Sequence, residues 1–231
     1  MRGVKINIFK SLFLVFFSLP IFMMCFPPPE LPDEPKISLS NISFVPLADG
    51  FNDSIKVTVR FEDGNGDLGL TGNEDDHPYN RFYYFDDGNG GRLNINSNDT
   101  MPPYTCETYK LDTFRVDGVL QGDTNYIRYN DRHWNFLMDM YVKENGEFEF
   151  YNFTTDPNCP PGFVGRFPIL NTSGKERALE GEILYEVVAG LRLPFRKDTV
   201  KFKVAIYDRT GNLSNTVESG EFKIDDLITP I

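Results

Sequence analysis

Four side chains with oxygen ligands follow a strand-like segment at a spacing suited to calcium. Asp63, Asn65 and Asp67 alternate with glycines in Phe61-Glu-Asp-Gly-Asn-Gly-Asp-Leu-Gly69, and Glu74 stands where a calcium loop places its bidentate carboxylate. Carboxylate and amide oxygens are the ligands that this cation prefers. The spacing therefore predicts a Ca²⁺ site at these four residues.

Departures from the EF-hand pattern leave a second interpretation open. Leu68 stands where an EF-hand requires glycine, and no helix-like segment flanks the loop. The site would then be a looser one between sandwich loops, with a further ligand from one of three acidic residues, Asp75, Asp76 or Asp208. Alternatively, the glycines supply the positive φ angles of a tight turn while Asp and Asn bond to their own backbone. Asp208-Arg-Thr-Gly-Asn212 has the same two interpretations, and the turn is the simpler one.

Residues that could support catalysis are sparse. His77 and His133 are the only histidines, and the chain has no Gly-x-Ser-x-Gly elbow, His-Glu-x-x-His helix or glycine-rich phosphate loop. Both histidines are expected to be surface or hydrogen-bonded side chains. Carboxylate pairs are too common in an acidic chain to indicate glycoside hydrolysis. We expect the protein not to be an enzyme.

Cys25 closes an N-terminal leader of the lipoprotein type. Basic residues Arg2, Lys5 and Lys10 precede an apolar stretch that ends at Met24, and residues 26–35 are polar and proline-rich. This organisation predicts a lipoprotein signal peptide over 1–24, a lipid on Cys25 and a tether over 25–35. Phe22-Met-Met24 departs from the usual lipobox, so an ordinary cleaved signal peptide and an uncleaved anchor are the alternatives.

Charge limits the partners that the chain can bind. The leader contains three basic residues and no acidic one, so the remainder has 20 basic and 34 acidic residues, a net charge of −14. Nucleic acid is therefore not expected as a partner, because phosphate binding needs clustered Lys and Arg. Cys106 and Cys159 are the only other cysteines, and in an exported protein such a pair predicts a disulfide.

Period-two alternation dominates the regular segments. Ile55, Val57, Val59 and Phe61 share one face of a predicted strand, and Val200–Tyr207 repeats the pattern. Further strands are expected over 37–45, 82–85, 134–142, 147–153, 163–170, 182–188 and 221–224, with a helical turn over 174–179. The pattern predicts an all-β antiparallel immunoglobulin-like β-sandwich over 36–231.

The region around 64–131 interrupts this pattern. It is rich in Asn, Asp, Gly and Tyr and has few aliphatic pairs, which indicates long loops and hairpins inserted between core strands. Its many aromatic residues favour an ordered insertion.

Two motifs carry a family resemblance. The Asp63 segment after an early strand and Asp208-Arg-Thr-Gly-Asn-Leu-Ser-Asn215 after a late one resemble immunoglobulin-like or fibronectin-III-like lipoproteins of the Bacteroidota. The resemblance covers residues 37–67 and 182–224, and it implies a sandwich fold and a lipid-anchored outer-membrane location, with the acidic residues after Cys25 favouring the cell-surface leaflet. We therefore expect a non-enzymatic accessory subunit of an outer-membrane complex for barrel assembly, secretion or nutrient uptake. A glycan-binding surface lipoprotein, using exposed Tyr and Trp, is the alternative.

Overall fold

The computed structural model describes residues 31–46, 53–98, 100–152, 162–188, 195 and 197–228. They belong to one unit of the chain, Leu31–Ile231. The leader, Cys25 and Cys159 lie outside the described residues. None of the helices among these residues is long and apolar enough to cross a membrane.

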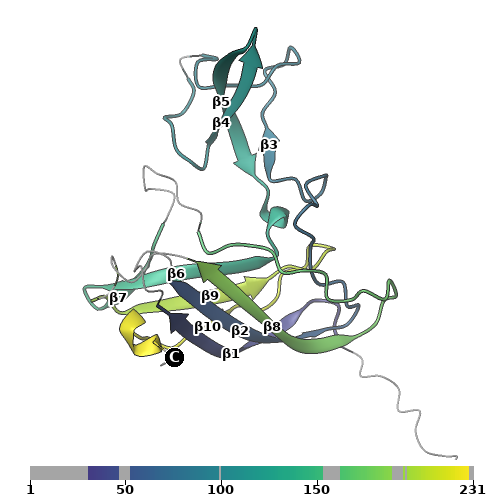
Figure 1. The fold of residues 1–231 in the computed structure, drawn as a ribbon, viewed down its shortest axis with the longest axis vertical. Helices are drawn as coiled ribbons and strands as arrows, with labels where there is room; N and C mark the ends of the chain where they lie inside the picture. The colour runs from purple at the N-terminus through teal and green to yellow at the C-terminus, as the bar shows by residue number, and fades with distance from the viewer. Residues whose placement is uncertain are drawn as a thin grey trace, which may run out of the picture. The chain divides into compact units, whose positions relative to one another are not determined.

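The first sheet of the sandwich has three antiparallel strands in the order β1-β2-β8 (Figure 1). They are β1 (Lys36–Val45), β2 (Ser54–Asp63) and β8 (Leu179–Val188). In the central strand β2, every second residue from Ile55 to Phe61 is buried, because side chains of a strand alternate between its two faces. This buried row is the sheet's contribution to the core.

The second sheet has four antiparallel strands in the order β10-β9-β6-β7. They are β6 (Phe136–Glu144), β7 (Glu147–Phe150), β9 (Val200–Ile206) and β10 (Val217–Glu218). Phe136, Met138 and Met140 of β6 are buried, and Phe136 stacks on Tyr185 of β8 with ring centroids 4.1 Å apart. The hydrophobic core therefore lies between the two sheets.

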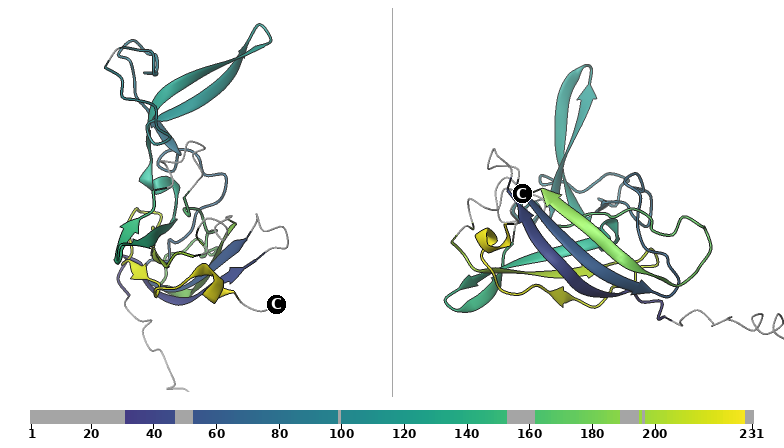
Figure 2. Two further views of the ribbon diagram at one scale, coloured as in Figure 1. Left: turned by 90° about the vertical axis from the view of Figure 1, so that its left-hand side faces the viewer. Right: turned by 60° about the horizontal axis from the view of Figure 1, so that its bottom comes forward.

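A third sheet, in the order β3-β5-β4, projects from the sandwich (Figures 1 and 2). It consists of β3 (Phe82–Tyr84), β4 (Tyr109–Val116) and β5 (Val119–Tyr129), and the 3₁₀ turn η2 (Asp131–His133) leads back to β6. Asp117 and Gly118 both have positive φ, 50° and 82°, as a two-residue turn with right-handed strand twist requires. The predicted insertion is thus an ordered sheet.

The structure confirms the predicted all-β antiparallel class, while the immunoglobulin-like topology stays a prediction. Three local expectations were wrong. Residues 163–170 form only an isolated bridge, between Gly165 and Phe136, because their backbone bonds both β6 and the loop after β2. The expected helical turn at 174–179 is absent because Leu179 already pairs with Asp63 as the first residue of β8. The expected strand over 221–224 is also absent, because Phe222 forms only an isolated bridge with Val200 and Ile224 already begins the 3₁₀ turn η4 (Ile224–Leu227).

Candidate functional site

Two aspartates continue the buried rows of the facing sheets. Asp63 follows Phe61 on the inward face of β2, and Asp208 falls two positions after Ile206, the last residue of β9. Asp63 is fully buried and Asp208 is 4% exposed. Leu68 forms an antiparallel bridge with Asp208, which brings the loop after β2 against the end of β9. The two strands therefore deliver their carboxylates to one place.

Asp67 completes an acidic cluster with these two residues. One carboxylate oxygen from each of Asp63, Asp67 and Asp208 lies within 4.8 Å of the others. Asp67 is held by the turn after β9: its backbone carbonyl accepts from Arg209 N at 3.1 Å, and its Oδ2 accepts from Thr210 N at 3.1 Å. The cluster thus joins the ends of β2 and β9.

The cluster leaves buried carboxylate oxygens without donors. Among the described residues, neither oxygen of Asp63 nor Oδ1 of Asp67 has a hydrogen-bond partner. Asp208 differs, because its Oδ1 accepts from Gly211 N at 2.6 Å and from Asn212 N at 2.7 Å, and its Oδ2 accepts from Asn212 Nδ2 at 2.7 Å. Only Asp208 is therefore fully explained as a turn residue.

Burial and mutual repulsion both raise the pKa values of carboxylates in the cluster. Burial, together with the charges of Asp67 and Asp208, raises the pKa of Asp63 to about 7. The backbone amides of Gly66 and Asp67 lie close enough to lower the pKa of Asp63 and partly offset this rise, but their geometry is too poor for a full hydrogen bond to its carboxylate. Burial and Asp208 also raise the pKa of Asp67.

The structure brings together only part of the predicted ligand set. Asn65 Oδ1 accepts from Asp67 N at 3.1 Å and so caps the turn. Glu74 lies outside the acidic cluster, and its carboxylate binds both Nη atoms of Arg209, at 2.6 and 3.2 Å. This ion pair lowers the pKa of Glu74 to about 2. Arg209, 135 positions away in the sequence, therefore binds Glu74. Asp208 is the third member of the acidic cluster in its place.

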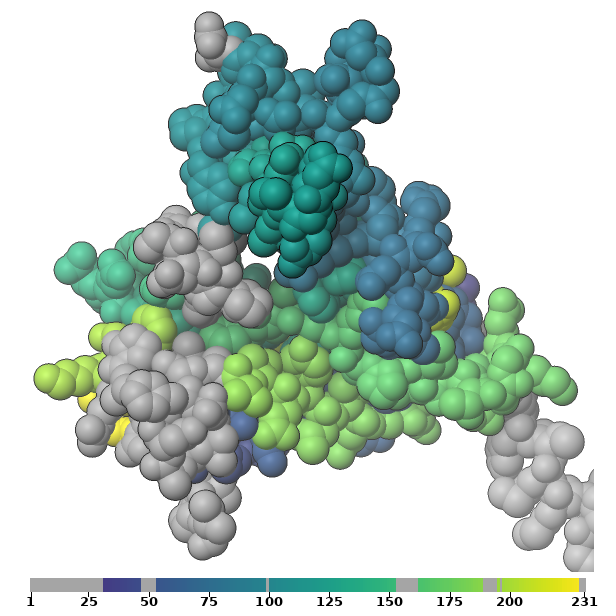
Figure 3. Space-filling model, turned by 45° about the horizontal axis from the view of Figure 1, so that its top comes forward, coloured from purple at the N-terminus to yellow at the C-terminus, as the bar shows by residue number. Residues whose placement is uncertain are grey.

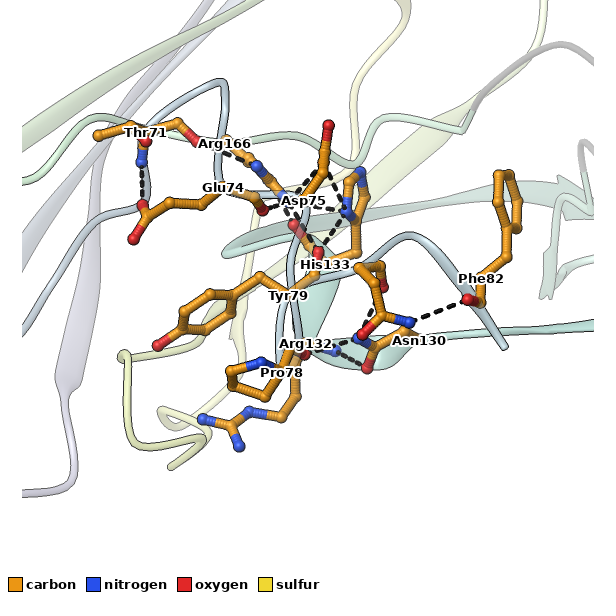
Figure 4. Close-up of polar contacts among 11 residues, drawn as sticks. Thr71, Glu74, Asp75, Pro78, Tyr79, Phe82, Asn130, Arg132, His133 and Arg166 are labelled. Carbon is orange, nitrogen blue, oxygen red and sulfur yellow. Dashed lines mark hydrogen bonds and ion pairs between the residues drawn. The ribbon is translucent and has the colours of Figure 1, made fainter. Parts of the chain in front are cut away.

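A buried arginine anchors the base of the insertion (Figure 4). Arg166 Nε donates to the His133 carbonyl at 2.6 Å, Nη1 to that of Thr71 at 2.9 Å, and Nη2 to those of Glu74 and Tyr79 at 3.0 and 3.1 Å. Its side chain is 9% exposed. Four backbone carbonyls from both ends of the insertion are therefore fixed to one guanidinium group.

Asn130 and Arg132 extend this junction toward the cluster (Figure 4). Asn130 Nδ2 lies 2.7 Å from the carbonyls of Pro78 and of Asn80. Arg132 Nη2 donates at 2.5 Å to the carbonyl of Arg209, the residue after Asp208. The junction thus ties the insertion to the same turn that holds the acidic cluster.

One histidine is hydrogen-bonded and the other is exposed, as their sequence context suggested. Burial lowers the pKa of His133, and its Nδ1 lies 2.7 Å from Arg166 Nη2 and 2.8 Å from the Tyr79 carbonyl. His133 Nδ1 can accept a hydrogen bond from Arg166 Nη2 or donate one to the Tyr79 carbonyl, according to its tautomer, and either contact makes it part of the junction. His77 is exposed.

A cavity of about 790 Å³ lies between the insertion and the second sheet. Its aromatic walls come from both parts: Phe85, Tyr126, Tyr129, Trp134, Phe150 and Phe163. The tyrosines that could form a sugar platform are Tyr83, Tyr84, Tyr126 and Tyr129, and only the last two line the cavity. Arg92 covers the ring of Tyr84 at 3.6 Å, and Arg128 approaches Tyr83 at 5.2 Å.

The tip of the β4–β5 hairpin exposes apolar side chains. Leu111, Val119 and Leu120 are 59–62% exposed, and Phe114 and Val116 are also exposed. The strand register places Val116 opposite Val119 on one face, while Leu111 and Leu120 lie on the other. The tip stands out toward the viewer in the space-filling view (Figure 3).

Cys106 is disulfide-bonded and lines the cavity. Cys159, its expected partner, lies outside the described residues, so the pairing stays a prediction. No protein-family model, curated protein or solved structure matches the chain significantly.

Proposed function

We propose that the chain is a non-enzymatic lipoprotein, anchored in the outer membrane through Cys25, whose insertion binds another envelope protein. It would serve as an accessory subunit of a barrel-assembly, secretion or nutrient-uptake complex on the cell surface. The lipoprotein-like leader supports the location. The hairpin tip carries the binding proposal, because Phe114, Val116 and Val119 lie exposed on one of its faces and contiguous apolar surface marks interaction sites.

The arrangement of the third sheet favours a protein as the partner. β4 is the outer strand of this sheet, so a strand of another protein could extend it by backbone hydrogen bonds while the partner's side chains cover the tip. The Arg166 and Asn130 contacts hold the base of the insertion in place, which reduces the conformational entropy lost on binding.

Affinity purification of the full chain from detergent-solubilised membranes tests this proposal. Val119→Asp and Leu120→Asp place charges at the tip, and Leu184→Asp is a matched control because Leu184 is 63% exposed on β8 of the sandwich. We expect one stoichiometric outer-membrane partner with the wild type and with Leu184→Asp, and at least a tenfold loss of it with the tip variants. Recovery of the wild type alone, or equal loss in the control, would contradict the proposal. A dimer of the chain itself would also contradict it.

The cavity favours glycan binding as the second candidate. Tyr126, Tyr129 and Trp134 line it together with Arg128 and Asp131, and aromatic faces beside polar groups suit sugars. Trp134 is the only tryptophan in the chain, so its fluorescence reports directly on the cavity. Saturable changes with neutral oligosaccharides, lost in Tyr129→Ala, would support this function. An unchanged spectrum at millimolar oligosaccharide would remove it.

A further inference from the structure

We propose that Asp63, Asp67 and Asp208 bind one calcium ion, which connects the end of β2 to the end of β9. The cluster alone would be weak support, since acidic groups often gather without an ion. Asp63 supplies the independent observation. It is fully buried, lies within the cluster and has no hydrogen-bond donor among the described residues for either oxygen.

A compensating positive charge would stabilise the cluster in its ionised form. Removing an ionised carboxylate from water costs several kcal/mol unless a partner is present. The guanidinium of Arg209, the residue after Asp208, already binds Glu74 with both Nη atoms and the Gly69 carbonyl with Nη1 at 3.2 Å. A bound cation would compensate three carboxylates at once and satisfy the free oxygens of Asp63 and Asp67.

The ligand types and spacing favour calcium among the common cations. The three residues offer only carboxylate oxygens, which suit a hard cation rather than zinc or copper. Oxygens on opposite sides of Ca²⁺ are about 4.6–5.2 Å apart and those around Mg²⁺ about 4.0–4.2 Å, from their usual metal–oxygen distances. Three oxygens that lie within 4.8 Å of one another can therefore share one Ca²⁺.

An ordinary glycine-rich turn explains less of the geometry. It accounts for Asn65 and Asp208, whose oxygens cap backbone amides. It does not account for Asp63, because an uncharged residue would serve a buried turn position at a lower cost. The loop is also built for close packing: Gly69 has φ +105°, and a Cβ there would overlap the carbonyl oxygen of Pro168.

Calcium would also strengthen the junction beneath the insertion. Asp208 precedes Arg209, whose carbonyl accepts from Tyr79 Oη at 2.8 Å and from Arg132 Nη2 at 2.5 Å. An ion that holds Asp208 would fix this carbonyl and, through it, both ends of the insertion. The ion would have a structural role that does not depend on which partner the tip binds.

Titration calorimetry of the full chain in detergent tests the inference, after chelation and removal of the chelator. We expect one Ca²⁺ per chain with a Kd of about 1 mM or tighter, the range of extracellular calcium modules, and binding of Mg²⁺ at least tenfold weaker. The melting temperature should rise by roughly 5–10 °C at a hundredfold excess of Ca²⁺ over Kd. No saturable heat and no melting shift up to 10 mM Ca²⁺ would overturn the proposal.

Matched variants identify the ligands. Asp63→Asn, and Asp67→Asn should the first fail to fold, are expected to weaken Ca²⁺ binding at least tenfold while the circular dichroism spectrum stays that of the wild type. Glu74→Gln and Asp87→Asn are controls that should keep affinity within twofold. Glu74 belongs to the Arg209 ion pair, and Asp87 lies in another glycine-rich turn, where its Oδ1 accepts from Asn89 N and Gly91 N. Binding that survives both cluster variants, or is lost equally in the controls, would refute the assigned ligands.

Discussion

The acidic cluster makes the stability of the chelated protein depend on pH in an unusual direction. The pKa of Asp63 is raised from 3.8 to about 7 when the chain is folded. Between these two values the folded chain holds a proton that the unfolded chain has released. The free energy of unfolding therefore falls as pH rises from about 4 to 7 and levels off above it. Asp63→Asn removes this loss, because the amide carries no charge.

The magnitude follows from the same two pKa values. One pKa unit corresponds to about 1.36 kcal/mol, so a rise from 3.8 to about 7 corresponds to at most about 4 kcal/mol at neutral pH. In chelator, Asp63→Asn should be as stable as the wild type near pH 4 and more stable by up to this amount at pH 7.5. For a domain of this size the upper limit is roughly 8–16 °C in melting temperature. Ca²⁺ at a hundredfold excess over Kd should narrow this difference by up to about 2.7 kcal/mol, because it stabilises the wild type more than the variant.

Urea unfolding at pH values from 4 to 8, with and without chelator, measures this difference. Asp87→Asn serves as the control: Asp87 is an exposed carboxylate in a turn of similar composition, and because its pKa is lowered the substitution should change stability by a nearly constant amount above about pH 5. The reasoning is refuted if the difference between Asp63→Asn and the wild type in chelator is constant over this range. It is also refuted if the variant is the less stable protein at pH 7.5.

Four further predictions each concern a single residue or a pair of residues. Glu74→Gln should lower the free energy of unfolding by only about 1 kcal/mol at neutral pH, because solvent screens its partly exposed ion pair with Arg209. The wild type should lose this contribution as pH falls from 4.5 toward 2, and acid unfolding measures that loss. Gly69→Ala should cost more than about 2 kcal/mol in urea unfolding, since φ is +105° and the added Cβ overlaps the Pro168 carbonyl; Gly72→Ala, with open space around it, should cost far less. Cys25→Ser should release the chain from membranes and remove the lipid mass from the N-terminal peptide, and unchanged retention and mass would contradict the lipoprotein assignment. Non-reducing peptide mapping should recover Cys106 linked to Cys159, and a free thiol at Cys159 would reject that pairing.

The sandwich strands were predictable because their side chains alternate between a face toward solvent and a face toward the core. β2 and β9 show the period-two pattern in the sequence and the same alternation of burial in the structure. β4 and β5 lack this signal. Along β4 only Tyr109 is buried, so polar and apolar residues mix on both faces and no alternation marks the strand. Their hairpin is fixed by the Asp117-Gly118 turn and by strand pairing. The periodicity of apolar residues reveals neither of these.

The candidate site was predictable where it depends on local sequence and missed where it depends on distant pairing. Spacing correctly placed Asp63 and Asp67 together, since both lie in one loop beside β2. Spacing also selected Glu74, but Arg209 approaches from the far end of the chain and binds it. The contacts of Arg166 with four carbonyls are equally long-range and have no sequence motif.

The buried rows contain a signal that could have completed the cluster. On β2 the inward positions 55, 57, 59 and 61 are apolar and position 63 is aspartate; on β9 the inward positions 200, 202, 204 and 206 are apolar and position 208 is aspartate. A period-two row that ends in an acid on each of two facing sheets places two carboxylates at the edge of one core. A buried charge at such an edge is costly without a partner, and the described residues leave Asp63 without a hydrogen-bond donor. The argument for a cation therefore begins with strand periodicity and does not depend on any EF-hand likeness.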